Sequence, residues 1–411
     1  MRAVGAIGGR MMQRGISLRQ WLPLLGITFS AFVFNTSEFM PIGLLTDIAA
    51  TFSLTEAQAG IMISVYAWAV MILSLPLMMA ASRIEFKKLL IGVIALFSLG
   101  QFLSAAAPSY LVLVLARLVV ACAHAVFWSI AAVCASRLVD VRHSALAVSM
   151  VATGTSIAMI FGLPIGRAIG LLVGWRMTFT IVGVVAAAIV VYLMACFPKM
   201  PAGEPFTLGQ LPLLLKNRVL MGIYATTILF ATGYYTGYSY IEPFLQQVGG
   251  MPDALITLML TVFGIAGLAG SVAMTRFYDR HRALFLAGSC AGVAAGLLLM
   301  RLTASAPVAF GSACAVWGMF ATTFSIAYQS EIIRCCDKDS STVAMSIFSG
   351  IFNLGIGSGT ALGGAVVSGV GIGFIGIVGG VIALGSLLLC VLTVLRPLAA
   401  TGAPAAGCRD A

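Results

Sequence analysis

Twelve long apolar runs limit most strongly how this chain can fold. Each is close to the length that an α-helix needs to cross a bilayer, roughly 20 residues. The 411 residues are 61% hydrophobic and 9% charged, whereas a soluble domain carries about 25% charged residues. No water-soluble core could bury so much apolar surface. The sequence therefore predicts an all-α polytopic membrane protein with twelve transmembrane helices.

The runs are separated by charged residues and by Pro or Gly breaks. They span residues 21–46, 57–80, 89–107, 109–136, 144–171, 177–197, 219–245, 254–275, 283–300, 306–333, 342–369 and 372–395. The first run is too long for a signal-peptide core, and no cleavage site follows it. We therefore expect the basic stretch Met1–Gln20 to precede the first helix rather than to be removed.

The basic residues are distributed unevenly between the two sides that these runs define. If the N-terminus is inside, nineteen of the 23 Lys and Arg residues fall in cytoplasmic segments and three fall outside. Cytoplasmic loops of membrane proteins are enriched in Lys and Arg. The count predicts that both termini are cytoplasmic, and it explains the net charge of +10 without a nucleic-acid partner.

Residues 198–218 form the longest internal loop and contain four prolines. They divide a predicted N-terminal six-helix bundle (1–197) from a C-terminal six-helix bundle with a short cytoplasmic tail (219–411). The halves resemble each other: Ser149, Gly162 and Gly166 align without gaps on Ser346, Gly359 and Gly363. Two parallel six-helix repeats are a common transporter architecture.

Glycines recur every fourth residue in the run 144–171, at Gly162, Gly166 and Gly170. This spacing lets two helices approach closely in lipid. Pro164 lies between two of these glycines and removes one helical hydrogen bond. We expect either tight static packing or a helix that rocks during transport.

Several segments resemble the major facilitator superfamily. The pattern Gly154-x7-Gly162-Leu163-Pro164-Ile165-Gly166 is similar to its helix-5 antiporter motif, and Leu113-x3-Arg117 is similar to its helix-4 motif. Four further segments resemble the bacterial sugar efflux transporters of the SotB type: Phe34-Asn35-Thr36-Ser37-Glu38-Phe39, Ala123-His124-Ala125-Val126-Phe127-Trp128-Ser129, Tyr238-Ser239-Tyr240-Ile241-Glu242-Pro243-Phe244 and Phe348-Ser349-Gly350-Ile351-Phe352-Asn353. The resemblance implies the major facilitator fold, the bacterial inner membrane, and proton-coupled antiport with the proton as coupling ion and no other cofactor.

One motif departs from the superfamily pattern. The loop Ser82–Lys88 lacks the acidic residue that the superfamily places near Arg83. Its second-half copy, Asp279-Arg280-His281-Arg282, is nearer the pattern. The departure predicts that the usual contact between loop and helix charges is missing from the first half.

Polar residues inside the apolar runs are the candidate site, because a charge at the helix centre costs about 2.5–3.5 kcal/mol or more. Transporters of this architecture bind substrate near the midplane. We expect substrate to contact Asn35, Glu38, His124, Trp128, Tyr234, Tyr235, Tyr238 and Asn353. An indole beside amides and an imidazole suits a sugar. The alternative is structural: His124 bonds a neighbouring helix and Trp128 only packs.

Proton coupling needs a group that titrates near the working pH. Histidine has an ordinary pKa of about 6.5, and His124 is the one histidine within an apolar run. We expect His124 to carry the proton, with Glu38 as the rival carrier and Arg117 as the residue that interacts with Glu38. Arg167 and Arg176 are interpreted as anchors at the outer surface, and Glu242 as structural.

The resulting prediction is a proton-coupled exporter of sugars or related small molecules that works as a monomer in the bilayer, without a metal. A multidrug/proton antiporter of the same fold and a passive facilitator remain alternatives. An enzyme that modifies lipids would need a dense polar cluster at one membrane surface, and the sequence shows none. We therefore expect no enzymatic activity.

Overall fold

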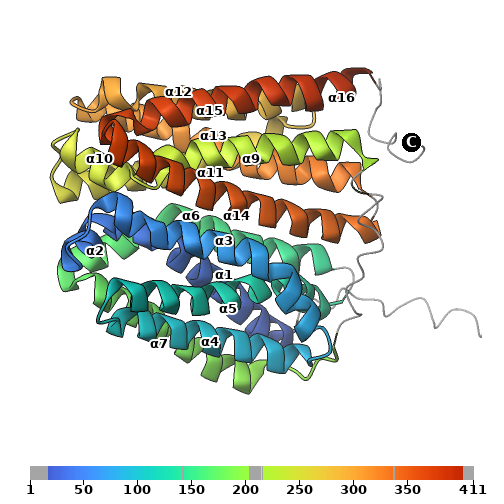
Figure 1. Cartoon of the computed structure of the whole chain (residues 1–411). Coiled ribbons are helices and arrows are strands. Elements are labelled where there is room, and N and C mark those ends of the chain that lie inside the picture. Colours follow the sequence, from blue (N-terminus) through green and yellow to red (C-terminus); the bar gives the residue numbers. More distant parts are fainter. Residues whose placement is uncertain (1–16, 141–142, 203–213, 215, 337, 401–411) are drawn as a thin grey trace, which may run out of the picture.

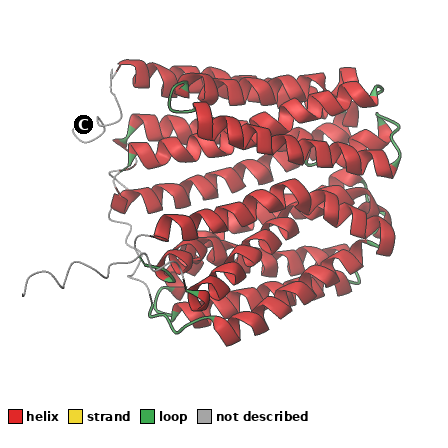
Figure 2. Cartoon of the chain, turned by 180° about the vertical axis from the view of Figure 1, so that it is seen from behind, coloured by secondary structure: helices red, strands yellow, loops and turns green. Residues whose placement is uncertain are grey.

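The computed structural model describes residues 17–140, 143–202, 214, 216–336 and 338–400 (Figure 1). Within these residues the chain is helical and contains no β-strand (Figure 2). The all-α prediction is confirmed.

Among the described residues, twelve long helices follow one another along the chain. They are α1 (Leu18–Phe39), α3 (Glu56–Ala81), α4 (Phe86–Ala106), α5 (Tyr110–Arg137), α6 (Ser144–Val173), α7 (Trp175–Cys196), α9 (Arg218–Tyr238), α11 (Asp253–Phe277), α12 (Arg282–Thr303), α13 (Pro307–Cys335), α14 (Lys338–Gly369) and α15 (Ile375–Cys390). The described residues also contain short helical segments: η1 (Met40–Leu44), α2 (Leu45–Thr51), α10 (Ile241–Gln247), η4 (Ile372–Phe374), η5 (Val391–Leu395) and α16 (Arg396–Ala400).

Every predicted run coincides with one of these long helices. Among the described residues, eleven helical segments are long and apolar enough to cross a membrane. The remaining long helix is α1, whose hydropathy is lowered by polar residues such as Asn35 and Glu38. Large apolar side chains such as Leu172, Leu302 and Val308 are exposed around the outside, as a lipid environment requires.

Two helices end earlier than their apolar runs. The run 21–46 changes from α-helix to a 3₁₀ turn at Met40, next to Pro41, which has no N–H for the α-helical ladder. The run 219–245 ends as α9 at Tyr238, and α10 begins at Ile241 with Pro243 in its first turn. Proline is tolerated in a first turn. Both breaks lie at the same end of the molecule.

The helices form two bundles, one from α1 to α7 and one from α9 to α16 (Figure 1). Two pairs of long helices join them, since α3 packs against α14 and α6 packs against α11, and the short α10 also contacts η1 and α2. Most of the predicted linker 198–218 lies outside the described residues, which omit 203–213 and 215.

The repeated glycines lie between helices of the same bundle. A Cβ at Gly162 would come 2.8 Å from the Thr36 hydroxyl oxygen, so α6 packs directly on α1. Gly359 gives α14 the same close approach to α9, at the Cβ of Tyr235. Gly154 extends the α6–α1 contact at Thr28, and Gly166 and Gly170 continue it onto η1 at Met40 and Leu44. Helix α6 continues through Pro164 without a break.

One face of α6 shows where the bundles separate. Ser149, Thr153 and Ser156 follow one another at helical spacing and are exposed, whereas Ile160 on the same face is buried against Gly264 of α11. The matching face of α14 carries the exposed Ser346 and Ser349 before it reaches the other bundle. The hydroxyls of Thr153 and Ser156 bond carbonyls of their own helix. The face they occupy is the one that packs on the other bundle at Ile160, so their exposure indicates a space between the bundles. The gap therefore opens toward the end of the molecule at which α1 and α14 begin.

Candidate functional site

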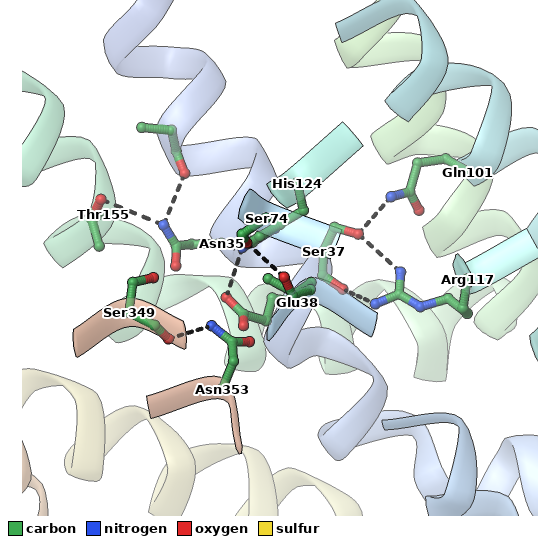
Figure 3. Close-up of polar contacts among 12 residues, drawn as sticks. Asn35, Ser37, Glu38, Ser74, Gln101, Arg117, His124, Thr155, Ser349 and Asn353 are labelled. Atoms are coloured by element: carbon green, nitrogen blue, oxygen red, sulfur yellow. Dashed lines mark hydrogen bonds and ion pairs between the residues drawn. The ribbon is translucent and has the colours of Figure 1, made fainter. Parts of the chain in front are cut away.

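The C-terminal part of α1 and the middle of α5 bring together three of the predicted ionisable residues (Figure 3). Glu38 and His124 are both buried, and the carboxylate Oε2 lies 3.7 Å from the imidazole Nε2. Phe34 and Tyr66 border the imidazole, with ring centroids 6.0 Å and 5.7 Å from it. The two groups form a buried acid–base pair beside aromatic rings, at a separation longer than a direct hydrogen bond.

Arg117 reaches α1 through the residue next to Glu38. Its guanidinium donates hydrogen bonds to the Ser37 hydroxyl (3.1 Å) and the Ser37 carbonyl (3.0 Å). Gln101 of α4 donates to the same hydroxyl at 2.5 Å. The guanidinium also lies 4.4 Å from the centre of the Tyr66 ring, a cation–π distance. Figure 3 shows Ser37 between Gln101 and Arg117.

Ser37, Gln101 and Tyr66 are site residues that sequence reasoning missed. A signal for Ser37 was present, because residues 35–38 form a continuous polar stretch inside an apolar helix. Gln101 and Tyr66 are single polar side chains on α4 and α3, and no motif marks them. The hydroxyl of Tyr66 is buried without a hydrogen-bond partner among the described residues.

Asn35 connects α1 to α6. Its side-chain amide donates to the Thr155 hydroxyl at 3.4 Å and to the Ala31 carbonyl at 3.2 Å. Trp128 lies one helical turn from His124, with the ring centroids 5.9 Å apart, and remains half-buried. Asn35 and Trp128 therefore lie beside the Glu38–His124 pair and carry no charge themselves.

The three predicted tyrosines belong to α9 and form an aromatic cluster. Tyr234 lies 4.7 Å from Tyr235 and 4.9 Å from Tyr238 between ring centroids. Trp317 of α13 closes the group, 5.7 Å from Tyr234. All four side chains are almost fully buried, so they form a rigid wall for whatever occupies the space beside them.

A small cavity, about 60 Å³ in volume, lies between this wall and the first bundle. Its lining includes Phe39 from α1, Ser156 from α6 and Phe263 from α11, together with the three tyrosines. Phe39 stacks toward Tyr235 with centroids 6.5 Å apart. Because Phe39 directly follows Glu38, the cavity and the ionisable group share one helix.

Asn353 stands on α14, in the second bundle, on the far side of Glu38 from Arg117 in Figure 3. Its amide nitrogen donates to the Ser349 carbonyl at 3.1 Å, and its buried Oδ1 has no partner among the described residues. His124 Nδ1 is likewise buried and unpaired there. A buried polar atom without a partner is costly, so these two atoms are candidates for contact with a transported molecule.

The second-half copy of the loop motif forms the contact that its sequence predicts. Glu331 of α13 accepts two hydrogen bonds from Arg282 and one from Tyr278, while Arg334 pairs with Asp279. In the first half Lys87 instead donates to the carbonyls of Met194 and Phe197. The departure of the loop Ser82–Lys88 from the superfamily pattern thus corresponds to a difference in contacts.

Comparison with known proteins identifies the family of this chain. Residues 27–343 match the family model described as the Major Facilitator Superfamily. The chain belongs to this superfamily. Since the match covers most of the chain and the fold agrees, the protein is a membrane transporter of the major facilitator type.

Two solved structures are similar over almost their whole length. Both are of a bacterial homolog to the human lysosomal transporter Spinster, one described as inward-facing and occupied and the other as inward-facing and unoccupied. They share 17% and 18% identity with this chain, with TM-scores of 0.66 and 0.65. Each match covers 94% of this chain and 96% of the other. At this identity the likeness concerns the fold.

Proposed function

We propose that the protein is a proton-coupled antiporter that exports sugars or related small molecules across the bacterial inner membrane by alternating access. The supporting observation is the buried Glu38–His124 pair next to a cavity with hydrogen-bonding and aromatic walls. An antiporter needs a group that binds a proton when substrate leaves and releases it when substrate enters. A carboxylate and an imidazole 3.7 Å apart provide such a group.

The direction of export follows from the predicted orientation. If the termini are cytoplasmic, the gap between the bundles opens to the cytoplasm, and substrate enters from there. The same description, inward-facing, applies to the two similar structures. Labelling of single cysteines in the loop 198–218 tests the orientation: a membrane-impermeant thiol reagent should reach them only from the cytoplasmic side. Labelling from outside in intact cells would reverse the assignment.

Substrate and proton compete for neighbouring atoms in this mechanism. A sugar hydroxyl can donate to His124 Nδ1 or to Asn353 Oδ1, which have no partners among the described residues. The apolar face of a sugar ring can stack on the tyrosines of α9. Substrate bound to the neutral imidazole would favour loss of its proton to the cytoplasm. External protons would then favour substrate release on the other side.

A multidrug antiporter is the second candidate, because the cavity wall is rich in aromatic and apolar groups. Phe39, Met159, Ile160 and Phe263 line it together with the tyrosines. Such a surface also suits flat lipophilic cations. The two candidates share the proton step and differ in the substrate.

Purified protein in vesicles that enclose a pH-sensitive dye distinguishes them. With an imposed pH gradient, addition of a substrate should release protons, and addition of a non-substrate should not. A panel of mono- and disaccharides is compared with lipophilic cations. Proton release by sugars supports sugar export, and release only by the cations supports the drug antiporter. Uptake of a sugar that is indifferent to the pH gradient would show a passive facilitator instead.

A further inference from the structure

A buried arginine joins the two bundles at the end opposite the gap. Arg167, near the C-terminal end of α6, is 1% exposed. One terminal nitrogen lies 2.9 Å from Glu242 Oε1 of α10 and donates to the Gly43 carbonyl at 2.8 Å. The other lies 2.8 Å from Asp253 Oδ1 at the start of α11. Arg167 is thus held by carboxylates of the other bundle, not by the lipid surface expected of an anchor.

Glu242, which belongs to the second bundle, is held by residues of the first bundle. It is 2% exposed, and its second oxygen accepts from the Thr46 hydroxyl at 2.8 Å and from the Thr46 backbone N–H at 3.3 Å. We name Arg167, Glu242, Asp253 and Thr46 the outer cluster. It links α2 and α6 to α10 and α11, so it spans the boundary between the bundles.

This arrangement differs from the other ion pairs of the molecule. Six ion pairs occur within the described ranges, and the two that cross between the bundles both use Arg167. The Arg282–Glu331 pair, for example, lies within the second bundle. A path through this end of the transporter cannot open while Arg167 holds carboxylates of the opposite bundle.

Once Arg167 is lost, repulsion between carboxylates at the outer cluster favours separation of the two bundles. Asp47 of α2 lies near enough to interact with both Arg167 and Asp253. Burial raises the pKa of the Asp47 carboxyl, the Arg167 charge lowers it, and Asp253 raises it further. Without Arg167, Asp47 of the first bundle would face Asp253 of the second bundle with no neutralising charge between them. Like charges at short range repel.

We propose that the outer cluster is the gate that closes the transporter at this end, with Arg167 as the residue whose contacts to Glu242 and Asp253 must break for the opposite conformation to form. This proposal rests on alternating access in the proposed function. It concerns neither the substrate nor the proton, and it assigns Arg167 a positioning role between the bundles.

Arg176 provides a matched control on the same bundle and at the same end. Its guanidinium donates to the carbonyls of Ala105 and Ala107 and lies over the Trp175 ring, 4.4 Å from its centre. All these partners belong to the first bundle. Loss of Arg176 removes an equal charge from the same end without touching a contact between bundles.

The gate is tested by measuring the separation of the bundles at this end. Spin labels at Ala106→Cys and Ser305→Cys, one on each bundle and both exposed, are placed in a background without the nine native cysteines. Pulsed electron spin resonance on protein in lipid nanodiscs reports the distance distribution. We expect Arg167→Ala to increase the long-distance population at least tenfold over the parent, and Arg176→Ala to leave it unchanged.

Further variants keep the test decisive if Arg167→Ala inserts poorly. Glu242→Gln keeps the shape and the Thr46 contact but removes the charge, so a smaller shift in the same direction is expected. Arg167→Lys should also shift the distribution, since a lysine cannot replace a bridging guanidinium. Unchanged distances in correctly inserted Arg167→Lys and Glu242→Gln proteins would overturn the proposal. The measurement needs no substrate and no pH gradient, so its outcome is independent of the vesicle assay.

Discussion

The centres of the two bundles use the same helix packing for different chemistry. In the first bundle, α1 and α5 bury Glu38, Arg117 and His124. In the second, α9 places Tyr234 and Tyr235 at the centre against Trp317 of α13. The glycine contacts of α6 with α1 and of α14 with α9 are equivalent. Related repeats have therefore kept their backbone contacts while their side chains diverged.

This difference indicates a division of labour. Ionisable groups inside a membrane are costly and mark proton or substrate pathways. The ion pair Arg282–Glu331 of the second bundle, by contrast, has a half-buried arginine and does not line the cavity. We infer that the first bundle carries the proton and that the second mainly shapes the substrate site. Substitutions in the first bundle should therefore affect proton coupling, and substitutions in the second bundle should affect substrate binding.

His124→Gln should give the largest effect, because it removes the imidazole and retains a polar side chain of similar size. Export driven by a pH gradient should fall to background, with some substrate binding left. Proton release in vesicles and binding by calorimetry measure the two quantities separately. His143→Gln, at the N-cap of α6 in the same bundle, serves as the control and should transport normally. If His124→Gln exports with unchanged pH dependence, Glu38 carries the proton.

Gly162→Leu should block transport in a normally inserted protein. Even a Cβ would come 2.8 Å from the Thr36 oxygen, and a larger side chain would push α1 away, carrying Asn35 and Glu38 with it. Overpacking of this kind costs about 1–3 kcal/mol. Gly92→Leu is the matched control, since nothing lies within 4 Å of an added Cβ there. Equal transport by both variants would exclude a role for the close α6–α1 contact.

The sequence predicts the helices and the close glycine contacts because both depend on local patterns. Apolar length marks a membrane helix, and a spacing of four residues marks one helix face. The sequence cannot show which helix that face packs against. Arg167 illustrates the limit: an arginine near a helix end resembles an interfacial anchor, and only the packing of α6 against α11 reveals its carboxylate partners. The contact of Arg117 with Ser37 depends on side-chain direction in the same way.

Arg117→Ala should impair exchange less completely. The guanidinium holds Ser37, and through it the backbone of α1 next to Glu38. Exchange rates are measured for Arg117→Ala, Glu38→Gln and the double variant, which form a thermodynamic cycle. We expect non-additive losses, because both residues act on one group. Strictly additive losses would mean that Arg117 and Glu38 work independently and that the first bundle holds two separate sites.

Tyr235→Phe should have the smallest effect and the most specific one. It removes one hydroxyl from the cavity wall and leaves the ring contacts with Phe39 and Tyr234 in place. A lost hydrogen bond is worth about 0.5–1.5 kcal/mol, so the half-saturating sugar concentration should rise a few-fold at unchanged maximal rate. Tyr192→Phe, whose hydroxyl bonds the Leu22 carbonyl away from the cavity, should leave it unchanged. The pH profile is the deciding measurement. If the second bundle alone recognises the substrate, the pH profile of Tyr235→Phe matches that of the parent protein. A shifted profile would mean that Tyr235, through Phe39, acts on the proton-binding pair as well, and that the two bundles do not divide these tasks.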